Sequence, residues 1–138
     1  MKYFAIDYGD PRTGMAVSDL GGTLSFALGC VTARDAQTAA EKVAQKIKES
    51  GAEMIVVGLP KNMDGSEGFR AQKTRKFSEI LSSLLPDIPL IHYDERLTTC
   101  AATYYLNEGN VRGKDRKKVI DALSAEIILQ NYLDSLKK

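Results

Sequence analysis

Acidic residues at three places in the sequence lie in or beside apolar segments. Asp7 interrupts the first apolar run, the pair Asp94 and Glu95 follows a later one, and Asp121 lies inside an apolar stretch near the C-terminal end. An ionised carboxylate in apolar surroundings is costly unless it is paired, hydrogen-bonded or bound to a cation. If these acids meet in space, they could hold two divalent cations about 4 Å apart, an arrangement that hydrolyses phosphodiester bonds.

Each acid also has a simpler explanation. Asp7 could cap the turn that Gly9 and Pro11 predict. The Asp94–Glu95 pair could mark a solvated strand end, where Arg96 pairs with a neighbour. Asp121 could pair with Lys117, one helical turn earlier. Taken singly, the acids are weak evidence, and the metal hypothesis depends on their meeting.

The residue types favour Mg²⁺ or Mn²⁺ over zinc. His92 is the only histidine, and Cys30 and Cys100 lie far apart without a Cys-x-x-Cys pair. Carboxylate oxygens are the ligands that Mg²⁺ and Mn²⁺ prefer. Because side chains alternate along a strand, only one of Asp94 and Glu95 can converge with Asp7.

The composition indicates one domain. The chain has 138 residues, 43% of them hydrophobic, which predicts a single domain over residues 1–138. Lys and Arg number 19 against 18 for Asp and Glu, so the overall charge of the chain does not indicate a nucleic-acid partner. Asp7 interrupts the apolar segment that a signal peptide would need, and no apolar run approaches the ~18 residues of a membrane span. We therefore expect a cytoplasmic protein without a membrane partner.

Apolar patterning predicts an α/β fold with a five-stranded mixed sheet flanked by helices. Three opening strands joined by short turns should be antiparallel, and the later strands parallel and buried, the fifth of them in a central position. The expected strands are Lys2–Tyr8, Thr13–Ser18, Leu24–Thr32, Glu53–Gly58 and Pro89–Tyr93. The expected helices are one that Asp35 caps and Gly51 ends, Phe69–Leu85, a short one from Thr98 or Thr99 to Asn107, and Asp115–Leu136.

Local clusters of basic and polar residues suggest where a nucleic acid would bind. Five of the seven residues from Arg112 to Lys118 are basic and precede Asp121, so phosphate contacts there would guide a backbone toward the metals. The contributors we expect are Arg112, Lys114, Arg116 and Lys117. A second basic group, Arg70 to Lys76, is at least as well explained as the solvated face of a helix.

The loop from Gly58 to Gly68 is a further candidate for substrate contact. Its glycines and the side chains of Asn62 and Ser66 suit close approach of a backbone phosphate, although Ser66 could simply cap the next helix. Arg96 could steady the acidic cluster or a scissile phosphate.

Four motifs in order resemble the YqgF/RuvX family of ribonuclease H-like proteins over nearly the whole chain. Members of this family are described as candidate Holliday junction resolvases and as pre-16S ribosomal RNA nucleases. The motifs are Ala5–Gly9 with Gly14–Asp19, Val57–Gly68, Asp94–Thr99 and Lys118–Ala125. The resemblance implies a ribonuclease H-like fold in which Asp7, Glu95 and Asp121 are the catalytic metal ligands. Asp94 is the substitute for Glu95 if the strand face is reversed.

The chain departs from the family pattern at two positions. Where the family usually carries a basic pair after the first glycine, this chain has Asp10, Pro11 and Arg12. Arg12 remains as a substrate-binding residue, but a negative charge replaces its basic neighbour, which puts substrate affinity near this turn in question. Ser124 replaces a small apolar residue, a change that should leave metal binding intact.

The resemblance favours a hydrolase that processes the 5′ end of precursor 16S ribosomal RNA, with a structured nucleic acid as partner. A junction resolvase is the alternative, and it requires a two-fold dimer, whereas RNA trimming needs only a monomer or weak homodimer. Asp7-Tyr-Gly followed by Arg12 also looks like the phosphate loop of actin-like ATPases, but one domain supplies only one of their two lobes. A nucleic-acid-binding module without catalysis is the remaining alternative.

Overall fold

The computed structural model describes the backbone of residues 1–95 and 113–136 and the side chains of residues 1–95 and 122–136. Within these ranges five strands and three helices follow one another in the order βββαβαβα. The short helix expected from Thr98 or Thr99 to Asn107 lies outside the described residues.

The five strands form one mixed sheet, which confirms the expected architecture. They are β1 (Tyr3–Asp7), β2 (Arg12–Ser18), β3 (Ser25–Thr32), β4 (Met54–Leu59) and β5 (Leu90–Asp94). Their order across the sheet is β3-β2-β1-β4-β5. Strands β1, β2 and β3 pair antiparallel, and β4 pairs parallel with both β1 and β5.

The expectation of a central fifth strand is wrong. Strand β5 lies at the edge of the sheet that the described residues form, and β1 occupies the centre. Every residue of β5 is partly exposed, whereas three of the five residues in β1 are buried. A short apolar run resembles a buried strand in either place, because one neighbouring strand and one covering helix are enough to require apolar side chains.

Two of the helix boundaries follow local signals in the sequence. Helix α1 (Ala36–Ser50) begins at Asp35, whose side chain accepts a hydrogen bond from the Thr38 amide at 2.7 Å, and ends at Gly51 with φ of 74°. Helix α2 (Phe69–Leu84) has Gly68 as its N-cap, with no side-chain cap. The alternative in which Ser66 caps α2 is therefore wrong. Helix α4 spans Gly113–Ser135.

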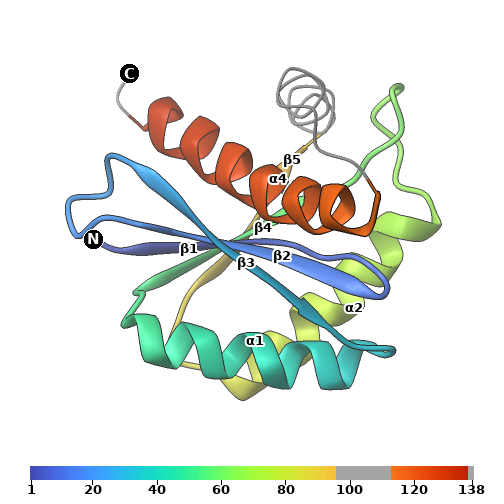
Figure 1. Ribbon diagram of the computed structural model, residues 1–138, viewed down its shortest axis with the longest axis horizontal. Coiled ribbons are helices and arrows are strands. Elements are labelled where there is room, and N and C mark those ends of the chain that lie inside the picture. Colours follow the sequence, from blue (N-terminus) through green and yellow to red (C-terminus); the bar gives the residue numbers. More distant parts are fainter. Residues whose placement is uncertain (96–112, 137–138) are drawn as a thin grey trace.

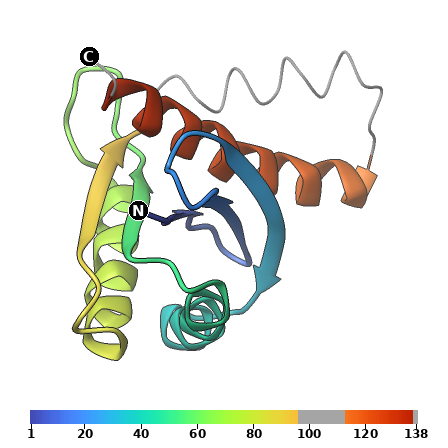
Figure 2. The same ribbon diagram turned by 90° about the vertical axis from the view of Figure 1, so that its left-hand side faces the viewer.

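The sheet lies between two layers of helix. Helices α1 and α2 cover one face and α4 crosses the other (Figures 1 and 2). The apolar core is divided in the same way. On the first face, Phe4 and Ile6 of β1 pack with α1 and α2, and on the second, Ala5 packs with Ile128 of α4. Alternate residues of each strand thus belong to opposite layers.

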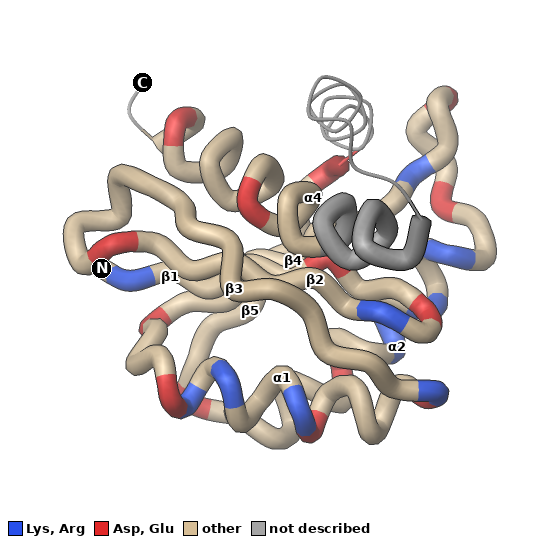
Figure 3. The backbone as a smooth tube through the Cα atoms, viewed as in Figure 1, with Lys and Arg blue, Asp and Glu red and all other residues tan. Residues whose placement is uncertain are grey.

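Charged residues are distributed unevenly over the elements. Acidic and basic residues are interleaved along α1, whereas β3 carries no charged residue (Figure 3). None of the helices among the described residues is long and apolar enough to cross a membrane.

Candidate active site

Strand alternation places Asp7 on the face that α4 covers. Ala5, two residues before Asp7, packs in the α4 core, while Phe4 and Ile6 pack with α1 and α2. Asp7 is the last residue of β1, and its backbone lies opposite Gly14 of β2. The carboxyl group therefore stands at the end of the central strand, beneath α4.

The same alternation decides between the two neighbouring acids at the end of β5. Tyr93 packs in the α4 core, whereas the Nε2 atom of His92 lies 2.9 Å from Ser78 Oγ on α2. By the same alternation, Asp94 lies on the face of the sheet that α2 covers, and Glu95, one residue beyond the strand, lies on the face that α4 covers. Glu95 is consequently the acid that shares a face with Asp7.

The structure brings the side chains of Asp7 and Glu95 into contact. A hydrogen bond joins the two carboxyl groups, and Glu95 is only 6% exposed. Two carboxyl groups can share a hydrogen bond only when a proton lies between them. Burial raises the pKa of the Glu95 carboxyl above its ordinary value, while the Asp7 hydrogen bond and the positive charge of Arg70 lower that pKa in part and the charge of Asp94 raises it.

Gly58 of β4 makes room for this contact. A Cβ atom at residue 58 would collide with Oε2 of Glu95 and would lie 2.6 Å from Cδ1 of Ile128. The Glu95 carboxyl therefore lies over the bare backbone of β4, between the sheet and α4. The sequence pattern did not reveal this role, because a glycine at the end of a strand ordinarily signals a turn.

The position of the third acid can be described only along the backbone. Residue 121 lies within α4, one turn before the buried Ala125 and two turns before the buried Ile128. Its side chain lies outside the described residues. Among the side chains that the structure does describe, no three of His, Cys, Asp or Glu gather closely enough to hold a metal ion.

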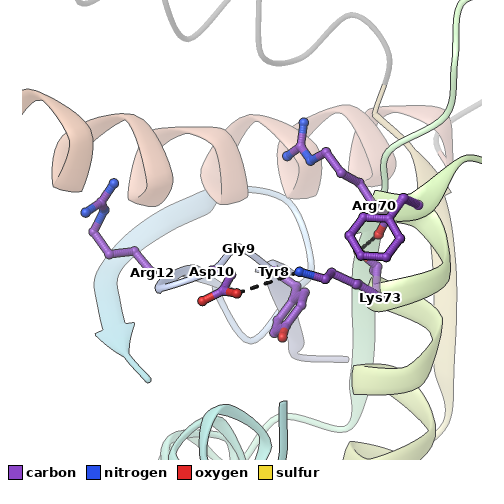
Figure 4. A pocket seen from close by; sticks show the side chains of 8 residues that line it. Tyr8, Gly9, Asp10, Arg12, Arg70 and Lys73 are labelled. Carbon is purple, nitrogen blue, oxygen red and sulfur yellow. Dashed lines mark hydrogen bonds and ion pairs between the residues drawn. The ribbon is translucent and has the colours of Figure 1, made fainter. Parts of the chain in front are cut away.

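A cavity of about 450 Å³ lies between the β1–β2 turn and the first turns of α2 (Figure 4). It adjoins the paired acids along the chain, since Tyr8 and Gly9, which line it, follow Asp7 directly. Its lining residues are Tyr8, Gly9, Asp10, Arg12, Phe69, Arg70, Lys73 and Thr74. Arg12, expected to bind substrate, is thus joined by Arg70 and Lys73 from the second basic group, which a solvated helix face explains at least as well as substrate binding. Side chains of that stretch point in different directions around α2, and only the fold shows which of them face the turn.

The loop between β4 and α2 is held by its own polar side chains. Asn62 Nδ2 donates to Ser66 Oγ at 3.0 Å, and Ser66 Oγ lies 2.6 Å from Asp64 Oδ1. Arg75 of α2 forms two hydrogen bonds with the Glu67 carboxylate, at 2.6 and 2.7 Å. The structure thus brings Asn62 and Ser66 together, with each bonded to the other.

The remaining predicted substrate contacts fall outside what the structure describes. Arg96 and Arg112 lie in the undescribed segment, and Lys114, Arg116 and Lys117 belong to the part of α4 whose side chains are not described. Their roles stay predictions.

Comparison with known proteins decides the family. A family model described as RuvX, Holliday junction resolvase, matches residues 1–135. The chain belongs to the RuvX family. It is therefore a nuclease, a hydrolase that acts on nucleic acid.

Relatives match over almost the full length. A protein of Acetivibrio thermocellus is 41% identical over 139 residues, covering 100% of this chain and 99% of its own. One of Thermoanaerobacter pseudethanolicus is 44% identical over 138 residues, covering 99% of each. Both are named as candidate pre-16S rRNA nucleases.

Solved structures show the fold of this RuvX family member to be ribonuclease H-like. The Fowlpox virus resolvase in complex with Holliday junction DNA superposes with a TM-score of 0.65 at 11% identity, over 100% of both chains. RuvC of T. thermophilus with a junction substrate superposes with a TM-score of 0.63 at 15% identity, over 99% of this chain and 96% of its own. At such low identity the likeness concerns the fold alone.

Proposed function

We propose that this chain is a nuclease dependent on divalent metal that processes the 5′ end of precursor 16S ribosomal RNA in the cytoplasm, acting as a monomer or weak homodimer. The contact between Asp7 and Glu95 carries the chemical part of the proposal. The names of the full-length relatives support the choice of RNA. The substrate would be a structured segment of the precursor.

The side chains at the site suit a hard divalent cation. Asp7 and Glu95 present carboxylate oxygens on one face of the sheet. Glu95 is also buried, a position that is costly for an acid without a partner or a cation. Two ionised carboxylates in contact repel each other, and a cation between them removes that repulsion as well as a proton does. The donor set therefore fits Mg²⁺ or Mn²⁺, and Asp121, by its helical spacing, would be the third ligand.

Bound between these acids, two such ions would supply an activated water and stabilise the leaving oxygen. The protein's own contribution is to hold the carboxylates in place. Gly58 leaves space for Glu95, and the end of β1 fixes Asp7 beside it. The cations of the neighbouring cavity, Arg12 and Arg70, would hold the phosphates of the strand being cut.

The decisive experiment replaces the central acid. We expect Asp7→Asn to abolish Mn²⁺- or Mg²⁺-dependent cleavage of a precursor 16S RNA fragment while its circular dichroism stays that of the wild type, because the change removes a charged ligand and almost no volume. Asp87→Asn, an exposed charge beyond the far end of α2, is the matched control and should cleave normally. Undiminished turnover by Asp7→Asn would refute the catalytic assignment.

A junction resolvase is the second candidate, favoured by the description of the matching family. The two substrates make different demands, since two coordinated cuts in a four-way junction require a two-fold dimer. Cleavage of precursor RNA and of a synthetic junction should be compared in fractions of known mass. A stable dimer that nicks junctions symmetrically and ignores RNA would reverse the preference.

A further inference from the structure

Lys73 lines the cavity and has two close neighbours, one in the β1–β2 turn and one on its own helix. Its Nζ atom lies 3.7 Å from Oδ2 of Asp10 in the β1–β2 turn and 4.8 Å from the centre of the Phe69 ring. Figure 4 shows the lysine extending from α2 toward the Asp10 carboxylate, across the space between the helix and the turn. The ammonium group thus faces an acid of its own chain across the cavity.

The surroundings of this pair favour an anionic ligand. Arg12, Arg70 and Lys73 line the cavity, and Asp10 is the one acid among the residues that line it. The cavity also adjoins the paired carboxyls, because Tyr8 and Gly9 follow Asp7 directly and the charge of Arg70 acts on Glu95. A phosphate next to the one being cut would reach these cations.

We propose that Asp10 competes with a substrate phosphate for Lys73, and so lowers both the affinity of this nuclease for nucleic acid and the salt dependence of its binding. The inference rests on the proposed function, because it takes the cavity as a subsite for the strand being cut. It assigns Asp10 as a residue that sets substrate affinity.

The geometry of the pair allows such an exchange. The Lys73 and Asp10 side chains are 44% and 51% exposed, so water screens their attraction and a phosphate can approach. The backbone next to Asp10 is tied to the chain after β3, since the Pro11 carbonyl accepts a hydrogen bond from the Ala33 amide at 2.9 Å. Lys73, on a flexible four-carbon stem, is the partner that can turn toward the ligand.

The test is a double-mutant cycle of binding. Asp10→Asn, Lys73→Gln and the double variant are titrated, together with wild type, against a labelled single-stranded oligouridylate in EDTA at several salt concentrations. Asp87→Asn and Lys48→Gln, exposed residues elsewhere on the surface, are the charge-matched controls. Thermal melting of each variant establishes that it is folded.

We expect Asp10→Asn to bind about two- to fivefold more tightly, the range of an exposed charge pair. Its plot of log K against log salt should steepen by about 0.7, the value of one added contact to a single strand. In the Lys73→Gln background, Asp10→Asn should bring neither gain, because both gains come from the Lys73 ammonium group that loses its Asp10 partner.

Three results would overturn the proposal. The first is that Asp10→Asn binds no more tightly than Asp87→Asn. The second is that its gain persists in the Lys73→Gln background, which would mean that Asp10 acts only through its own repulsion of phosphate. The third is that neither the wild type nor any variant binds the oligouridylate. Cleavage with Mn²⁺ is assayed separately, so that a wild type without nuclease activity would refute the proposed function and leave the binding cycle to be judged by itself.

Discussion

The carboxyl group of Glu95 occupies the space that a side chain at Gly58 would fill. We expect Gly58→Ala to displace that carboxyl from Asp7, because Oε2 of Glu95 and Cδ1 of Ile128 are the ends of side chains and can move. Cleavage should fall by about 100-fold, the cost of moving a reacting group by about an ångström. The protein should stay folded, with a loss of about 1–3 kcal/mol of stability from overpacking.

The Gly58→Ala prediction is checked by measuring kcat/KM together with a urea unfolding curve. Gly51→Ala is the matched control, since residue 51 ends α1 away from the site and its substitution strains the backbone without touching Glu95. Full activity of Gly58→Ala would show that the position of the Glu95 carboxyl does not matter for cleavage.

The two acids at the end of β5 should behave differently. Glu95→Gln should lose nearly all cleavage, whereas Asp94→Asn, on the face toward α2, should retain most of it. Steady-state rates of both variants at saturating Mn²⁺ decide the question. The reverse ranking would assign the ligand role to Asp94.

Glu95→Gln should also be more stable than the wild type in EDTA at neutral pH. Burial raises the folded-state pKa of Glu95 above its ordinary value of 4.5, so the stability that its protonated form contributes is complete below pH 4.5 and is lost as the pH rises through the folded-state pKa. Glutamine is never charged and avoids that loss. Melting temperatures at neutral pH and at pH 4 test this, and the gain should shrink at the lower pH.

His92 should make the fold sensitive to mild acid. Burial lowers the pKa of His92 below its ordinary value of 6.5, and Arg75 adds to the shift while Glu67 opposes it. The unfolded chain therefore takes up a proton first, so stability is complete above pH 6.5 and is lost as the pH falls from there toward the folded-state pKa.

We expect His92→Gln to flatten the fall in unfolding free energy between pH 6.5 and pH 5, because glutamine does not titrate and can still bond to Ser78. Urea denaturation across that range is the measurement. Parallel curves for the variant and the wild type would show that another group causes the pH dependence.

Asn62 and Ser66 should act as one unit. Their side chains bond to each other at 3.0 Å, so either Asn62→Ala or Ser66→Ala breaks the same contact in the loop before α2. We expect the double variant to lower kcat/KM no further than the more damaging single one. Additive losses would indicate that each side chain contacts the substrate independently.

Local patterns in the sequence were sufficient for most of the elements. Asp35 and Gly51 delimit α1 because capping and a left-handed backbone are properties of a few adjacent residues. The same is true of the apolar runs that became strands, since a strand buried on either face needs such side chains. The cost of burying an acid likewise singled out Asp7 before its surroundings were known.

The sequence alone determined the strands, the caps of α1 and the presence of acids in apolar segments, where burying a charge costs free energy. Only the tertiary structure decided that Glu95 rather than Asp94 meets Asp7, that Gly58 leaves room for the contact, and that Asp10 faces Lys73. Spacing along the chain restricts which side chains share a face. Which faces meet depends on strand order and register, and these are set by packing between segments far apart in the sequence.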